Sequence, residues 1–221
     1  MEFDKSASEY NKILNGALTA SGYGWDFFAR YKARFITNLV GAGFDGKILD
    51  YGCGIGNLES FLKPLLPKAR LDGHDVSTES LQRIDPSLLH QGVFTSDMQR
   101  LDANYDLIVV ANVFHHIVPT SRQATIETLR ERLGSAGRLI IFEHNPLNPL
   151  TRLSVRLSPI DKNAQLVSAK PMMTMMRRAG FSEIDRRFIV FFPKMLSWLQ
   201  PLEPRLSWLP LGAQYVLISK K

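Results

Sequence analysis

A predicted strand that runs directly into a glycine-rich turn is the feature that most constrains this chain. Residues 48–57 read ILDYGCGIGN, with glycine at positions 52, 54 and 56. Closely spaced glycines let backbone N–H groups approach a ligand where a Cβ atom would collide. The spacing differs from the G-x-G-x-x-G of dinucleotide-phosphate loops. Asp50 lies just before the first glycine, so the loop favours a ligand with an amino group over a pyrophosphate.

Strands and helices alternate on both sides of this loop. Apolar runs predict strands at residues 47–51, 70–75, 92–95, 105–111, 138–142, 183–192 and 212–219. Periodic apolar positions and end signals predict helices at residues 5–18, 27–39, 58–65, 77–81, 126–133 and 168–179. This alternation is typical of an α/β fold with a parallel sheet and right-handed crossovers.

Three segments depart from the alternation. The first two helices precede the first strand, so residues 1–40 are expected to form a helical cap that acts as a mobile lid. Pro146 and Pro149 argue against an immediate helix, so residues 145–167 are expected to be irregular. Residues 193–211 contain prolines with Trp198 and Trp208. Long irregular stretches in compact domains are usually functional, so the last two segments are expected to build the substrate side of one domain, residues 1–221.

The motifs resemble, in order, those of the class I S-adenosylmethionine-dependent methyltransferases. The loop at residues 48–57 matches the first motif of that family, Asp75 matches its ribose-binding acid, and Asp97 with Met98 matches the segment beside the adenine. Residues 105–112, YDLIVVAN, match the fourth-strand motif, and residues 133–139, LGSAGRL, look like a degenerate form of the turn before strand five. The resemblance covers residues 45–145 well and the flanks loosely.

The resemblance implies a fold, a cofactor and a set of binding residues. The fold class is α/β: a Rossmann-like seven-stranded, mostly parallel sheet with an antiparallel last strand, helices on both faces and the N-terminal cap. The cofactor is S-adenosyl-L-methionine, bound by the core at residues 45–145. The expected cofactor-binding residues are Asp50, Gly52, Gly54, Gly56, Asp75, Val76, Asp97, Met98 and Asn112. A helix N-cap is the competing role for Asp75, and a loop cap is the competing role for Asp97.

The candidate catalytic residues follow strands four and five. A sulfonium methyl group is already activated, so a methyltransferase mainly aligns and desolvates the acceptor, and an oxygen or nitrogen acceptor can also need a base. His115 and His116 follow strand four, and Glu143, His144 and Asn145 follow strand five. We name His116, His144 and His115 as catalytic candidates, with packing as the alternative role. No metal-ligand spacing is present, so we expect an enzyme without a metal.

Composition limits the partners. The single cysteine, Cys53, leaves no disulfide framework, and the polar N-terminal stretch has no signal-peptide core, so a cytoplasmic location is expected. Residues 151–221 hold 12 basic and 4 acidic side chains, and the rest of the chain is close to neutral. This excess favours nucleic acid, an anionic membrane or an anionic substrate, or is a solvated basic face. The apolar residues of 188–211 suggest a peripheral membrane or lipid contact, with core packing or a homodimer interface as alternatives.

These observations favour a methyltransferase that moves a methyl group to an oxygen or nitrogen atom of a largely apolar small molecule, such as a natural-product, quinone, lipid or glycan precursor. A nucleic-acid methyltransferase is the alternative suggested by the pI of about 9.5. Residues 111–114 lack the Asn/Asp-Pro-Pro-Tyr motif of such enzymes, so no nucleic-acid partner is expected. A cofactor-binding protein without catalysis is the non-enzyme alternative.

Overall fold

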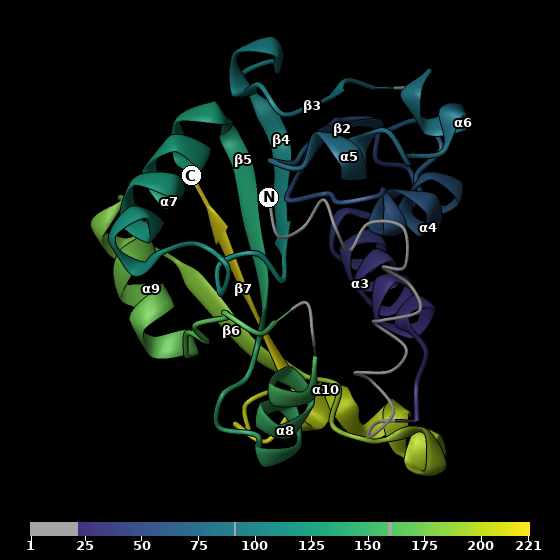
Figure 1. Cartoon of the computed structure of the whole chain (residues 1–221), viewed down its shortest axis with the longest axis vertical. Helices are drawn as coiled ribbons and strands as arrows, with labels where there is room; N and C mark the ends of the chain where they lie inside the picture. The colour runs from purple at the N-terminus through teal and green to yellow at the C-terminus, as the bar shows by residue number, and fades with distance from the viewer. Residues whose placement is uncertain (1–21, 91, 159–160) are drawn as a thin grey trace.

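Seven strands form a single sheet in the order β3-β2-β1-β4-β5-β7-β6 (Figure 1). The computed structural model describes residues 22–90, 92–158 and 161–221. The strands are β1 Lys47–Tyr51, β2 Arg70–His74, β3 Phe94–Thr95, β4 Tyr105–Ala111, β5 Leu133–His144, β6 Ile184–Ile189 and β7 Gln214–Lys220. Strand β7 is antiparallel to both of its neighbours, and the other pairs are parallel. The predicted fold class is confirmed.

Helices cover both faces of the sheet (Figure 1). Helices α3 Trp25–Val40 and α4 Asn57–Leu65 pack on one face, and α7 Pro119–Arg132 and α9 Ala169–Arg178 pack on the other. The short helices α5 Thr78–Leu81, α6 Pro86–Leu89 and the 3-10 helix η3 Met98–Arg100 lie between β2 and β4 in the chain. Each face has its own apolar cluster, because both sides of the central strands β1, β4 and β5 are buried.

Helix α3 is a layer of the core. Its residues Ala33 and Ile36 are fully buried in the cluster that also holds apolar residues of β1 and β4. Opening this helix would expose the sheet to water, so a lid motion of α3 carries a cost, and the motion itself stays a prediction. The other predicted helix of the cap, residues 5–18 with Tyr10, lies outside the described residues, so the prediction is untested there.

The segment after β5 contains a helix that the sequence reading missed. Helix α8 spans Pro149–Leu157, within the stretch expected to be irregular. Pro149 occupies the first turn, where a proline loses no helical hydrogen bond, and the Asn148 side chain caps the helix by accepting from the Thr151 backbone N–H at 3.0 Å. The proline thus begins a helix that it was expected to prevent.

Two strand boundaries also differ from expectation by three residues or more. Strand β5 begins at Leu133, not at Arg138, because Leu133 is fully buried and pairs with Tyr105 before a register shift. Strand β6 ends at Ile189, not at residue 192. Val190 has a φ of 59°, and its N–H and that of Phe191 bond to the buried Glu203 carboxylate. Beyond this point lie the 3-10 helix η4 Lys194–Leu202 and α10 Glu203–Leu206.

The strand order reverses between β1 and β4. Strand β1 pairs with β2 on one side and with β4 on the other, so the connections leave the sheet in opposite directions there. Ligands of open α/β sheets bind at such a switch point, outside the carboxyl ends of the strands. No helix among the residues that the structure describes is long and apolar enough to cross a membrane.

Candidate active site

A pocket opens at the carboxyl ends of β1, β4 and β5. Four groups of residues line it. The glycine loop contributes Asp50, Gly52, Cys53 and Gly54; α3 and the residues before it contribute Tyr23, Phe28 and Lys32; the ends of β4 and β5 contribute Asn112, His115, His116 and His144; and the later segments contribute Asn148, Leu150, Thr151, Ser154, Asp161, Val190, Phe191, Phe192, Pro193 and Gln214. The three predicted catalytic histidines therefore share one pocket with the first half of the predicted cofactor loop.

The glycine loop meets the requirement for close approach at two positions. Gly54 has a φ of 56°, and a Cβ built on it meets no atom within 4 Å, so its backbone faces open space in the pocket. Gly52 has a φ of 87°, and a Cβ there would lie 2.2 Å from a methyl carbon of Val113. The loop thus needs glycine for conformation at both positions and for space at Gly52.

Asp75 lies at the end of β2 and holds the glycine loop. Its Oδ2 accepts the Gly54 N–H at 2.8 Å, and its Oδ1 accepts the Ser77 N–H at 2.8 Å. A carboxylate has about four lone-pair positions, so it can accept further bonds from a ligand. Asp75 lies beside the pocket but outside its lining, as do Gly56 and the exposed Val76.

Asp97 and Met98 follow β3. The Asp97 side chain caps η3 by accepting the Gln99 N–H at 2.9 Å, which is the loop-cap role considered as its alternative. Met98 packs against the apolar cluster on the α7 face. Neither residue lines the pocket, so their contact with adenine stays a prediction.

Three buried charged groups surround the cofactor side of the pocket. Lys32 of α3 donates to Asn112 Oδ1, and burial lowers the pKa of Lys32 to about 8. Burial raises the pKa of Asp50 to about 7, although Glu59 and Lys32 partly oppose this rise. Burial and Asp50 raise the pKa of Glu59 well above its ordinary value.

Burial of the Asp50 and Glu59 carboxyls raises the pKa of each, which favours one proton shared between them. Oδ1 of Asp50 and both oxygens of Glu59 are buried, and no donor among the described residues bonds to them. A proton on one of the two carboxyl groups would supply such a donor. Two adjacent buried carboxylates cannot both ionise cheaply, so one stays neutral. The sequence reading missed Glu59 and Lys32. Lys32 stands four residues after Phe28 on the apolar face of α3, and a charged residue in that position was the available signal.

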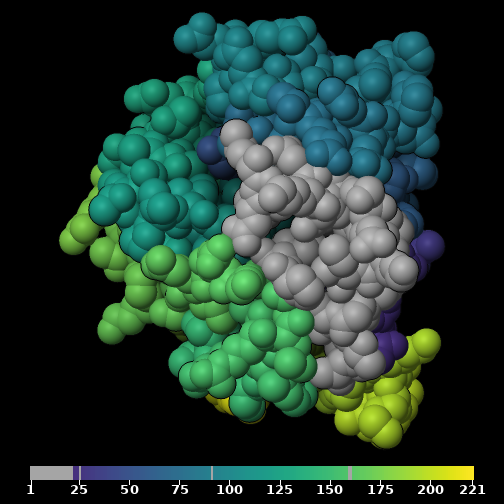
Figure 2. All heavy atoms as spheres, viewed as in Figure 1, coloured from purple at the N-terminus to yellow at the C-terminus, as the bar shows by residue number. Residues whose placement is uncertain are grey.

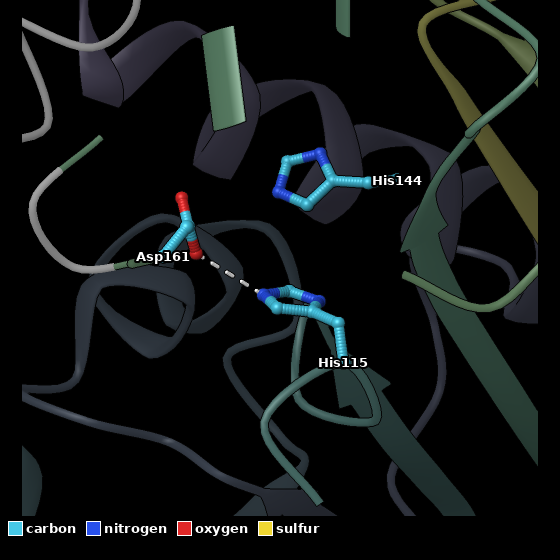
Figure 3. Close-up of side chains that lie close together, drawn as sticks. All are labelled: His115, His144 and Asp161. Atoms are coloured by element: carbon cyan, nitrogen blue, oxygen red, sulfur yellow. Dashed lines mark ion pairs between the residues drawn. The ribbon is translucent and has the colours of Figure 1, made fainter. Parts of the chain in front are cut away.

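The histidines form a second polar group with two carboxylates, here called the histidine–carboxylate cluster: His115, His116, Glu143, His144 and Asp161. Glu143 is fully buried and accepts His115 Nδ1 at 2.7 Å, with its other oxygen on the Phe114 N–H at 2.7 Å. Asp161 Oδ1 lies 3.3 Å from His115 Nε2 and 3.4 Å from His116 Nε2. Figure 3 shows the His115 and His144 rings and the Asp161 carboxylate turned toward one another.

The pKa values of the groups in this cluster shift in different directions. Burial lowers the pKa of His115, but Glu143 and Asp161 outweigh it and raise that pKa to about 9. Burial opposes ionisation of Glu143 and Asp161, yet the histidines hold the pKa of each carboxyl at about 2. Burial, reinforced by charge on His115, lowers the pKa of His144 to about 4. Near neutral pH, His144 is therefore a neutral imidazole with a free lone pair to offer, whereas His115 is an imidazolium between two carboxylates.

Asp161 and Asn145 complete the arrangement. Asp161 lies in the turn after α8, and its position was not expected from the sequence, because 16 residues separate it from His144 with no motif between them. The His115 carbonyl accepts the Gln165 N–H at 2.8 Å, which fastens this turn to the loop after β4. The Asn145 side chain donates to the carbonyls of Pro210 and Gly212, so Asn145 joins the backbone segments around the pocket and does not line it.

Comparisons with known proteins agree with this geometry. A family model described as a methyltransferase domain matches residues 49–139. An uncharacterized methyltransferase of Staphylococcus carnosus is 28% identical over 64% of this chain and 65% of its own. Ribosomal RNA small subunit methyltransferase C of Aliivibrio salmonicida is 34% identical over 45% of this chain and 32% of its own, so the chain spans about a third of that relative. A SAM-dependent methyltransferase of Archaeoglobus fulgidus has a TM-score of 0.69 at 16% identity, over 90% of this chain and 95% of its own.

The methyltransferase-domain match and the shared fold support the resemblance to the class I S-adenosylmethionine-dependent methyltransferases. The matched domain covers the strand, glycine loop and following strands that line the pocket, and the fold is shared over nearly the whole length. S-adenosylmethionine is the cofactor of that class, and the pocket fits it on two observations. Asp50 lines the pocket, where its carboxyl group can accept an amino group, and Gly54 leaves open space at the loop.

We predict that Asp75→Ala weakens binding of S-adenosylhomocysteine by about 2–4 kcal/mol, measured by isothermal titration calorimetry. The variant removes the expected bonds to both ribose hydroxyls, and a bond to a charged group contributes roughly 1.5–3 kcal/mol. Asp45→Ala, at an exposed carboxylate elsewhere, is the matched control and is expected to bind normally. Unchanged affinity in Asp75→Ala contradicts the ribose contact.

We predict that Glu59→Gln makes stability less dependent on pH. The folded pKa of Asp50 is about 7 and that of Glu59 is also raised, so the folded state holds a proton that the unfolded state releases above pH 4. Stability from this proton is present below about pH 4 and is lost as pH rises through 7, by up to about 1 kcal/mol per pH unit. Urea unfolding at pH 5 and pH 8 is expected to show a smaller decline for Glu59→Gln than for wild type or the exposed control Glu131→Gln. Equal declines contradict the shared proton.

Proposed function

We propose that this protein transfers a methyl group from S-adenosylmethionine to an oxygen or nitrogen atom of a small, largely apolar acceptor. The main observation behind the proposal is that residues of the glycine loop and of the histidine–carboxylate cluster line the same pocket. In this proposal Asp50 binds the amino group of the cofactor, Lys32 its carboxylate and Asp75 its ribose. The histidines then lie on the side where the acceptor enters.

The chemistry assigned to the chain is alignment and proton removal. When bound, the cofactor supplies an activated methyl group on a sulfonium. The lone pair of the acceptor heteroatom forms the new bond to carbon, the carbon–sulfur bond breaks, and its electron pair stays on sulfur. The acceptor's proton leaves through the cluster. Proton transfer by positioned side chains and exclusion of water both favour the reaction in a closed pocket.

The acceptor side of the pocket supports an apolar substrate. Phe28, Leu150, Phe191, Phe192 and Pro193 line the wall around the histidines. Small-molecule pockets are typically apolar, with a few placed polar groups that fix orientation. In this proposal, residues of α8 and the residues that follow β6 therefore form the acceptor side. Trp198 and Trp208, expected in this wall, are 73% and 69% exposed and lie outside the pocket lining, so that part of the expectation is wrong.

The exposed tryptophans belong to an apolar surface beside the pocket. Helices α8 and η4 lie at the same end of the molecule (Figures 1 and 2). We define the apolar end surface by its exposed large side chains: Leu147, Leu150, Leu153, Leu157, Met195, Leu196, Trp198, Leu202, Trp208 and Leu211. Soluble monomers rarely expose so many large apolar residues together, which supports a contact surface.

Charge supports an anionic lipid bilayer as the partner of the apolar end surface. Residues 145–157 and 193–211 contain the exposed cations Arg152, Arg156, Lys194 and Arg205. Their one acid, Glu203, is buried. Apolar side chains flanked by cations are typical of helices that lie in a membrane interface. Leu150 belongs both to this surface and to the pocket lining, so an amphipathic acceptor could pass from a bilayer into the site.

Ribosomal RNA is the second candidate acceptor, because relatives with that name match the core. The match to them covers less than half of the chain and about a third of theirs. The acceptor assay below therefore includes RNA.

We predict methyl transfer in an assay with radiolabelled S-adenosylmethionine and a panel of phenols, amines and amphipathic alcohols, with ribosomal RNA as a separate arm. His144→Ala is expected to lose at least about 100-fold in turnover, the order contributed by proton-transfer groups, while binding S-adenosylhomocysteine normally. The control is His90→Ala at an exposed histidine outside the pocket. Transfer to RNA alone overturns the small-molecule proposal, and equal turnover in His144→Ala overturns the role of the cluster.

We predict that the protein binds vesicles that contain phosphatidylglycerol and binds neutral vesicles weakly, measured by cosedimentation. A Trp198→Ala/Trp208→Ala variant is expected to bind roughly 10-fold or more weakly, because burial of a large apolar side chain contributes about 1.5–3 kcal/mol. A Leu89→Ala/Val118→Ala variant, which removes exposed apolar residues elsewhere, is the control. Sedimentation velocity tests the homodimer alternative, and loss of a dimer in the tryptophan variant contradicts the membrane surface.

A further inference from the structure

The histidine–carboxylate cluster contains more ligand atoms than a proton-transfer pair requires. His115, His144 and Asp161 each offer one atom, and these atoms all lie within 4.8 Å of one another. They come from three different parts of the chain: the loop after β4, the end of β5 and the turn after α8 (Figure 3). We propose that these three side chains bind a divalent transition-metal ion at the acceptor side of the pocket. The proposal deepens the proposed methyl transfer and rests on it only for the role of the ion.

One ligand–ligand distance in the cluster matches tetrahedral coordination. Zinc lies about 2.0–2.1 Å from histidine nitrogens and carboxylate oxygens, so two ligand atoms of one tetrahedral ion are about 3.4 Å apart. His115 Nε2 and Asp161 Oδ1 are separated by 3.3 Å. The His115 and His144 ring centres are 5.0 Å apart, and the ligand atom of His144 lies within 4.8 Å of the other two, so His144 must move closer to complete the site.

Glu143 provides the support that metal-binding histidines usually have. A histidine that binds a metal through one nitrogen almost always donates its other N–H to a carboxylate, a carbonyl or water. His115 Nδ1 lies 2.7 Å from Glu143 Oε2, which leaves Nε2 directed at Asp161. Glu143 is itself fixed by the Phe114 N–H, so the whole unit is held by the ends of two adjacent strands.

The charges of the cluster also suit a divalent cation. Glu143 is fully buried and the Asp161 side chain is 13% exposed, so the site holds two carboxylates with little access to water. Buried charges are costly unless they are paired, and a divalent ion that displaces the His115 proton on binding balances both carboxylates. The nitrogen-rich ligand set favours zinc or a neighbouring transition metal over magnesium or calcium.

Three protein ligands leave a fourth position open. Catalytic zinc sites have this composition, with water or substrate in the remaining position. The neighbouring pocket wall places an acceptor hydroxyl or amine at that position, where the ion lowers the pKa of the bound group as it does for water. The proton then leaves to solvent, and the acceptor keeps its lone pair for the methyl group. The sequence predicted no metal, because ligands at positions 115, 144 and 161 follow no short spacing pattern.

The test is zinc binding by the tag-free full-length chain after dialysis against a chelator. Calorimetry with Zn²⁺ alone is expected to give one site per chain, and Co²⁺ is expected to give the visible absorption bands of a tetrahedral site. His144→Ala and Asp161→Asn are each expected to weaken zinc binding more than Glu143→Gln, for which about 10–100-fold is typical of a supporting residue. His90→Ala, at an exposed histidine, is expected to bind zinc as wild type does.

Two results overturn the metal site: no stoichiometric zinc binding by the wild-type chain, or equal binding by wild type and Asp161→Asn. Circular dichroism and S-adenosylhomocysteine binding show that each variant is folded, and Asp161→Asn carries the test if His144→Ala does not fold. Methyl transfer without zinc binding overturns only the metal site. Zinc binding in a chain that methylates no acceptor overturns only the proposed function.

Discussion

Glu143 is the buried carboxylate on which the acceptor side of this molecule depends. It is the second-last residue of β5. Its two oxygens accept hydrogen bonds from the Phe114 N–H and the His144 N–H, and one of them lies against His115 Nδ1. These bonds join the loops that leave two adjacent parallel strands. A carboxylate with no exposed surface is stable only with such partners, so its burial and the loop geometry require each other.

The pocket contains two groups of buried charges with different tasks. Lys32 and Asp50 line the same pocket as the three histidines and Asp161, and the buried Glu59 acts on the Asp50 carboxyl. Asn112 follows β4, with a φ of 61°, and its Oδ1 accepts from Lys32. Asparagine tolerates this left-handed conformation better than most residues, which allows one position to end the strand and fix the lysine.

The outer end of the pocket continues into an apolar surface. Leu150 contributes to both, and the rest of the apolar end surface extends over α8 and η4. The pocket is lined by both polar and apolar side chains, and Leu150 links it to the exposed apolar residues. A pocket of this form suits an acceptor with one reactive polar group and an apolar body, as the proposed function requires.

The sequence by itself determined the central sheet, the glycine loop and the class of the protein. Residues 48–57 and 105–111 are local patterns in which glycine spacing and continuous apolar runs follow from backbone geometry and burial, so their structure could be predicted. Boundaries set by distant partners could not be predicted. Val190 leaves β6 because Glu203 holds its N–H, and Pro149 begins a helix because Asn148 caps it. The sequence also named His115 and His144, but only the tertiary structure brought Asp161 and Glu143 to them and placed Trp198 outside the pocket. These contacts join residues far apart in the chain, and their geometry depends on how the strand ends meet in the folded sheet.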